Sequence, residues 1–170
     1  MSRRILLAIV LVLSAVFFSC SGEDGAVGPT GKSGNANVIV YQYDTRTTSS
    51  GSFSYDFEAS RGLVDSSLVL AYYYYSAPAD TFWYAVPGMG PAGAFLTRSI
   101  WSQTSTSPST FSYWVGLMNP DGSGSYYTST TFLKFKIVLA PASVIIPATS
   151  RGLLNLSDYN AVADYLGLSE

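Results

Sequence analysis

Polar and apolar residues alternate along two segments of the chain with the period of a β-strand. In Ser52–Glu58, three aromatic residues alternate with serine, aspartate and glutamate; in 133–139, aliphatic and aromatic residues alternate with Lys134 and Lys136. A period of two places apolar side chains on one face of a strand and polar ones on the other. Both segments therefore predict antiparallel strands with one face in the core and one in water.

Shorter runs of β-branched and aromatic residues, separated by clusters of Gly, Ser and Pro, predict the other strands. The predicted strands are Val38–Tyr43, Ser52–Glu58, Leu68–Tyr75, Thr81–Val86, Ala94–Ser102, Thr110–Met118 and an interrupted Tyr127–Ala140. About seven short strands predict an all-β fold, an antiparallel β-sandwich. We expect this domain to span residues 36–170.

Only the C-terminal tail has the pattern of a helix. The segment Leu156-Ser157-Asp158 supplies an N-cap for this helix, and Gly167 suits the position after its last turn. Tyr159, Val162 and Leu166 follow at helical spacing and form an apolar stripe. The sequence therefore predicts a short C-terminal helix that packs on the sandwich through these three side chains.

The N-terminus has the pattern of a secretory signal peptide. Arg3 and Arg4 precede the apolar segment Ile5–Phe18, in which Ser14 is the only polar residue. As a helix this segment would span about 21 Å, less than the roughly 30 Å of a hydrocarbon core. A basic start followed by an apolar region of this length predicts a signal peptide over residues 1–19. A retained membrane helix is the alternative.

Cys20, the single cysteine of the chain, directly follows the predicted signal peptide. Phe17 is too large for the site of an ordinary signal peptidase, which requires small residues. The segment 17–20 resembles the lipobox of bacterial lipoproteins, although Phe17 stands where the usual lipobox has leucine. The resemblance implies that Cys20 carries acyl chains, palmitate among them, which anchor the protein in a membrane. By the same resemblance, Ser21 favours the outer membrane.

Glycine recurs at every third position after Cys20, at Gly22, Gly25, Gly28, Gly31 and Gly34. This is the spacing of collagen, whose crowded axis admits only glycine. Five triplets with one proline, Pro29, are too few for a free-standing triple helix. Residues 20–35 are therefore predicted to be an extended, collagen-like spacer. Glu23 and Asp24 resemble the export signal of surface-exposed lipoproteins, or they only solvate the spacer.

Several of these features together resemble a group of uncharacterised lipoproteins of Bacteroidota-type bacteria. The shared features are a cysteine with a Gly-x-y segment, the opening Asn35–Val38, the strand sequence Phe135–Val138, and a tail helix with Asp158, Tyr159, Val162, Tyr165 and Leu168. The resemblance implies a lipid-anchored β-domain in the outer membrane, on its periplasmic side or at the cell surface. It implies no activity.

The composition removes several classes of function. The chain has no histidine, one cysteine and a net charge of −2. Without histidine, Ser/His/Asp and Cys/His catalytic sets are impossible, as are zinc sites built from histidine and cysteine. A single cysteine excludes an internal disulfide, and the slight negative charge argues against a nucleic-acid partner. We expect neither a cofactor nor a metal site.

Paired carboxylates are the remaining route to catalysis. Asp56 and Glu58 share one strand face, with roughly 6.5–7 Å between their Cα atoms, a spacing that suits a glycosidase. They lie on the polar face of an alternating strand, so we expect this face to be solvated. We therefore favour a protein without enzyme activity, with glycoside hydrolysis as the alternative. Asp121 in the segment Asn119–Gly124 is of the residue type that binds calcium, but a lone carboxylate favours an ordinary turn.

Aromatic residues make up 15% of the chain and include the run Tyr72–Tyr75. We predict a hairpin in which Tyr75 pairs with Thr81 across a five-residue loop. This register puts Tyr73, Tyr75 and Trp83 on the face with the lower aliphatic content, which we assign to solvent. They form the predicted ligand-binding patch, for a glycan or an envelope protein, with core packing as the alternative. The sequence thus favours a lipid-anchored envelope protein acting as a non-catalytic binding or structural module.

Overall fold

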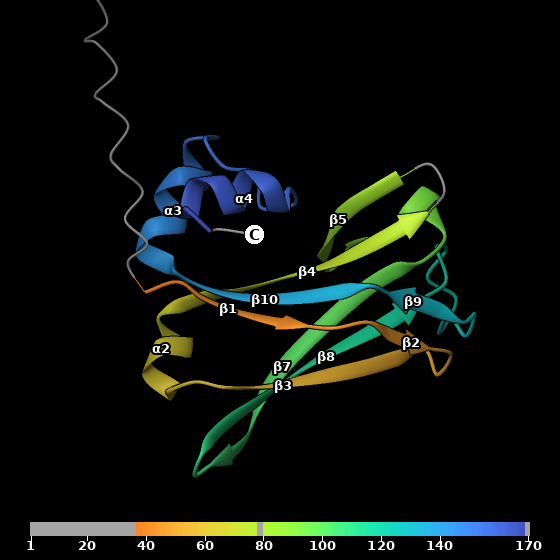
Figure 1. Cartoon of the computed structure of the whole chain (residues 1–170), viewed down its shortest axis with the longest axis horizontal. Helices are drawn as coiled ribbons and strands as arrows, with labels where there is room; N and C mark the ends of the chain where they lie inside the picture. The colour runs from red at the N-terminus through yellow and green to blue at the C-terminus, as the bar shows by residue number, and fades with distance from the viewer. Residues whose placement is uncertain (1–36, 78–79, 169–170) are drawn as a thin grey trace, which may run out of the picture. The chain divides into compact units, whose positions relative to one another are not determined.

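The computed structural model describes residues 37–77 and 80–168 (Figure 1). The predicted signal peptide, Cys20 and the Gly-x-y spacer lie outside the described residues and stay predictions. The described residues belong to one compact unit, Ser33–Glu170.

Two four-stranded antiparallel sheets form the predicted sandwich. The first, which we name the covered sheet, has the order β1 (Ile39–Tyr43), β10 (Lys134–Pro141), β4 (Ser67–Ala77), β5 (Asp80–Val86). The second, named the open sheet, has the order β3 (Ser52–Glu58), β8 (Ser109–Met118), β7 (Leu96–Thr106), β6 (Gly88–Met89). A short pair, β2 (Arg46–Thr48) and β9 (Thr130–Phe132), completes the strands. The all-β prediction is confirmed.

The core between the two sheets is largely aromatic. Phe53, Tyr55 and Phe57 of β3 are buried in it, while the polar residues between them are exposed, as the alternation predicts. Their rings contact those of the covered sheet: the centroids of Tyr55 and Phe135 are 4.9 Å apart. At the same core, Tyr73 of β4 meets Phe132 edge-on at 4.9 Å. Offset and edge-on pairs of this kind stabilise a core beyond the area they bury.

A second core lies on the other face of the covered sheet, under two helices (Figure 1). These are α3 (Ala142–Ser150) and α4 (Tyr159–Leu166). Asp158 caps α4, because its Oδ1 accepts hydrogen bonds from the backbone amides of Asn160 and Ala161. Gly167 ends the helix at a φ of 64°. Tyr159, Val162 and Leu166 are buried against the sheet. The predicted C-terminal helix and its docking side chains are confirmed.

The prediction that only the tail is helical is wrong. The described residues also contain α3 and the single-turn helix α2 (Arg61–Asp65). In α3 the apolar side chains do not gather on one side, since Ile146 is 54% exposed whereas Ile145 is buried. Polarity along the sequence therefore gives no helical stripe at this segment.

The prediction that one face of β10 is wet is also wrong. Lys134 is exposed, but Lys136, two residues along on the same face, is only 5% exposed. Helix α4 covers this face, so a strand predicted to be half-solvated is buried on both sides. The consequence is an ammonium group inside the second core.

Candidate functional site

The predicted aromatic patch of Tyr73, Tyr75 and Trp83 does not form. The predicted hairpin register is wrong by one residue, because Tyr75 pairs with Phe82 and Ser76 pairs with Thr81. Tyr73 is fully buried between the sheets, and Tyr75 packs against the same core. Trp83 lies on the opposite face, under α4. Both faces of this hairpin are apolar, so their polarity could not select the register.

A pocket of about 360 Å³ opens between β1 and the C-terminal segment that contains α4 and the two residues after it. We name it the β1–α4 pocket. It is lined by Val38, Val40, Gln42, Lys136, Tyr159, Gly167 and Leu168. Val40 and Gln42 alternate along β1 and so present their side chains to the same face, and Val38 directly precedes this strand. The size is that of a site for a small molecule.

Lys136 supplies the positive charge of the pocket. Its Nζ lies 4.5 Å from the ring centre of Trp83 and 4.4 Å from that of Tyr159. It donates a hydrogen bond of 2.5 Å to Tyr159 Oη. The face of the Trp83 ring carries the negative part of its quadrupole, which stabilises a cation, while the hydroxyl of Tyr159 accepts a hydrogen bond from the same ammonium. The ammonium is thus held in place by aromatic side chains beside a pocket.

Tyr72, which lies behind Lys136, is held in its neutral form. Tyr72 pairs with Lys136 from the neighbouring strand β4, and its ring contacts that of Tyr159 at a tilt of 59°. Its hydroxyl donates a 2.8 Å hydrogen bond to the backbone oxygen of Leu156. Burial, chiefly, and the neighbouring Tyr159 and Asp158 raise the pKa of Tyr72 above its ordinary value. A neutral Tyr72 hydroxyl remains a donor and holds the segment that precedes α4.

The two ends of the β1–α4 pocket differ in polarity. Gln42 pairs with Lys136 in the sheet, and Lys136 bonds Tyr159, so these three residues share one end. Val38 lies four residues before Gln42, just ahead of β1, and Leu168 follows the last turn of α4, so both lie toward the other end. Val40 lines the middle and is 36% exposed. The pocket therefore has a polar, cationic end and an apolar end.

Sequence reasoning missed Lys136 and Gln42 as site residues. It placed Lys136 on a solvated face, yet Val138 and Ala140, at two and four residues along, share that face and are apolar. A lysine that shares its strand face with apolar residues further along predicts that another element covers this face.

The predicted carboxylate pair lies apart from this pocket. Asp56 and Glu58 are exposed on β3, an edge strand of the open sheet. Their backbone oxygens accept hydrogen bonds from the hydroxyls of Tyr43 and Tyr41, which tie β1 to β3. In the turn 119–124, Asp121 Oδ1 accepts a 2.9 Å hydrogen bond from Ser123 N, and this contact lowers the pKa of Asp121. Nowhere in the described chain do three metal-ligating His, Cys, Asp or Glu residues gather.

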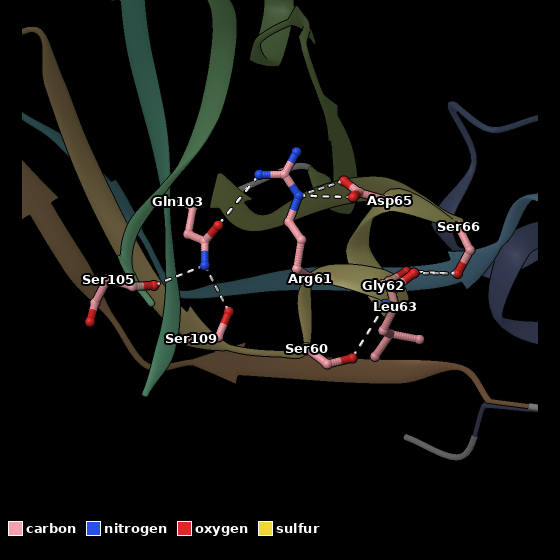
Figure 2. Close-up of polar contacts among 9 residues, drawn as sticks. All are labelled: Ser60, Arg61, Gly62, Leu63, Asp65, Ser66, Gln103, Ser105 and Ser109. Carbon is pink, nitrogen blue, oxygen red and sulfur yellow. Dashed lines mark hydrogen bonds and ion pairs between the residues drawn. The ribbon is translucent and has the colours of Figure 1, made fainter. Parts of the chain in front are cut away.

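A polar cluster around α2 has a structural role (Figure 2). Ser60 Oγ accepts the N-capping bond from Leu63 N, and Arg61 pairs with Asp65 one turn later at 2.8 Å. Gln103 donates to Ser105 O and to the hydroxyl of Ser109 where the register of β7 and β8 shifts. The cluster caps a helix and closes a bulge, and its charges are already paired.

The open face of the open sheet carries one large aromatic side chain, Trp114. Its ring passes over Gly116, where a Cβ atom would lie 2.4 Å from Trp114 Cη2. The guanidinium carbon of Arg98 is 5.4 Å from the ring centre. Its register partner on β7 is Ile100, which is 67% exposed. The result is a partly exposed indole on a sheet face that no other described element covers, beside apolar and charged neighbours.

No helix among the described residues is both long and apolar enough to cross a bilayer. Comparison with family models, with curated proteins and with solved structures finds no match for this chain.

Proposed function

We propose that this protein is a lipid-anchored protein of the cell envelope whose β-domain is a non-catalytic binding module. The observation that carries the binding role is the β1–α4 pocket, in which a buried ammonium lies beside an opening of ligand size. The anchor is supported by the basic start, the apolar segment Ile5–Phe18 and Cys20. The partners are then a membrane, through acyl chains on Cys20, and a ligand of the domain.

The non-catalytic role is supported by the placement of the acidic groups. Asp56 and Glu58 are exposed on a solvated strand face. A glycosidase acid is kept protonated by a buried, low-dielectric site, which this face does not supply. We therefore do not favour the hydrolase alternative.

Replacing Cys20 with Ser should abolish lipid labelling of the protein. Cys20 is the only cysteine, so no other thiol offers a thioether site for the lipid. Cells grown with an alkyne analogue of palmitate are lysed, and the labelled protein is detected after coupling to a fluorophore. Two or more acyl chains bind a membrane firmly, so Cys20→Ser should also leave the membrane fraction.

Equal labelling of the wild type and Cys20→Ser would contradict the anchor. Digestion of whole cells with an external protease then reports the side of the outer membrane. Loss of the domain from intact cells indicates surface exposure, and protection indicates the periplasmic side.

A glycan-binding role is the second candidate, and Trp114 is the observation that favours it. An indole held flat on a sheet offers an apolar face to the C–H face of a sugar ring. The exposed Ser54 pairs with Trp114 in the sheet register, and the partly buried Ser112 lies two residues before Trp114 on the same face of β8; both hydroxyls can bond hydroxyl groups of a sugar. This candidate site, on the open sheet, takes the place of the predicted patch of Tyr73, Tyr75 and Trp83 on the covered sheet.

On a glycan array, Trp114→Ala should weaken any glycan binding by about tenfold, which is the loss of about 1.4 kcal/mol of stacking energy. Trp101→Ala is the matched control, because Trp101 lies on the neighbouring strand and is 40% exposed. Equal binding by the wild type and Trp114→Ala would exclude Trp114 as the platform.

A further inference from the structure

We propose that the β1–α4 pocket binds a linear, amphiphilic monocarboxylate with an alkyl chain of medium length. The proposal rests on the binding role proposed above and adds the chemical class of the ligand. Three features of the pocket carry it: its charge, its polarity from end to end, and its length.

The charge of the pocket selects an acid. Lys136 is the only residue with a full positive charge among the described residues that line the pocket, and none of them is Asp or Glu. An ammonium forms shorter and stronger hydrogen bonds with a carboxylate than with a neutral acceptor. The amide of Gln42, opposite Lys136 in the sheet, adds a further donor at the same end. A carboxylate at this end complements both groups.

The apolar end selects an alkyl chain. Val38, Val40 and Leu168 offer only hydrocarbon, and Gly167 has no side chain to narrow the space. The C-terminal end of α4 lies at this end, and its partial negative charge disfavours an anion there. The ligand is thus oriented, with its carboxylate at Lys136 and its alkyl chain directed toward Leu168.

The length of the pocket limits the chain. Gln42 lies in β1 and Val38 directly precedes this strand, four residues earlier; at strand rise, four residues span about 13 Å. An extended alkyl chain of roughly eight to ten carbons has this length. Each methylene that leaves water contributes about fourfold in affinity. Affinity should therefore rise from hexanoate to decanoate and rise no further with longer acids.

An extended peptide is a poorer fit. Peptides that bind β-domains commonly pair their backbone with a strand edge. The β1–α4 pocket is lined by side chains on the face of β1, and the other side of that strand is packed on the core between the sheets.

The test is photolabelling of the full chain in its native membrane. The probe is decanoic acid with a diazirine in its alkyl chain, and the modified residues are identified by mass spectrometry. The expected label lies on 38–42 or on 167–168, and excess decanoate should reduce it at least tenfold. Lys136→Met, which keeps the length of the side chain without its charge, should reduce the label by a similar factor.

Two further variants keep the test decisive if Lys136→Met does not fold. Val40→Trp fills the middle of the pocket and should block labelling. Ile39→Trp is the matched control, because Ile39 is 37% exposed but faces the other side of β1. Ile39→Trp should label like the wild type. Equal loss of label in both variants would contradict the assignment of the pocket.

The corresponding diazirine alcohol separates the ligand class from the binding role. If the alcohol labels the pocket as well as the acid does, and Lys136→Met changes neither, the carboxylate assignment is overturned while the pocket remains a binding site. If neither probe labels the pocket, both the assignment and the binding role are overturned. If a peptide ending in leucine competes and decanoate does not, the ligand is a peptide and the proposal is wrong.

Discussion

Tyr73→Ala should lower the free energy of unfolding by about 3–5 kcal/mol, the usual cost of removing a large buried aromatic side chain. Tyr73 is fully buried, and its ring lies 5.3 Å from that of Tyr84 and 4.9 Å from that of Phe132. Truncation would open a cavity between the two sheets. Urea unfolding followed by tryptophan fluorescence measures the difference.

The adjacent tyrosines should respond in opposite directions to loss of their hydroxyl groups. Tyr73 Oη is buried and has no hydrogen-bond partner among the described residues, so Tyr73→Phe should raise the unfolding free energy by about 1 kcal/mol. Tyr72 Oη donates to the backbone oxygen of Leu156 at 2.8 Å. Tyr72→Phe leaves that oxygen without its donor and should cost about 1–2 kcal/mol.

The Tyr73→Ala variant also tests which face of β4 lies in the core between the sheets. If Tyr73 faced solvent, as the sequence led us to expect, Tyr73→Ala would cost little. A loss below about 1 kcal/mol would contradict the observed burial of Tyr73.

The strands could be predicted where one face is wet and the other is buried. The segment Ser52–Glu58 forms β3 with the predicted bounds, because its polar residues face solvent and its aromatic residues face the core. The C-terminal helix could be predicted as well, since Asp158 and Gly167 mark its ends and its stripe is apolar. In both cases a local pattern and the tertiary environment agree.

The covered sheet could be predicted less well, because both of its faces are buried. Tyr72 and Tyr73 are adjacent, aromatic and almost fully buried in different cores. Such a strand has no polar face to identify its orientation or its register. The helices α3 and α4 together form a third layer beside the two sheets. The sequence pattern predicts only α4.

The candidate site was missed because its central residue departs from the ordinary location of its type. A lysine is rarely buried unless another group compensates its charge. At Lys136 that compensation comes from Trp83 on β5 and Tyr159 on α4, which lie 53 and 23 positions away in the chain. Their contact depends on the hairpin register and on helix docking at once.

Lys136→Glu should therefore be among the most damaging single substitutions in the domain, with a loss of about 3–5 kcal/mol. The introduced carboxylate would be buried against the negative face of the Trp83 ring and beside the hydroxyl of Tyr159. Lys134→Glu is the matched control: it makes the same change two residues earlier on the same strand face, where the side chain is exposed. It should change the unfolding free energy by no more than about 0.5 kcal/mol.

The pH dependence of unfolding identifies the charge as the cause. Burial raises the pKa of an introduced carboxyl above its ordinary value, so the folded state of Lys136→Glu takes up a proton more readily than the unfolded state does. Stability relative to the wild type should then increase as the pH falls through that raised pKa, because the neutral acid costs less to bury. Lys134→Glu should show no such recovery. If Lys136→Glu keeps its full deficit in acid, the loss arises from packing, and the electrostatic account of Lys136 is wrong.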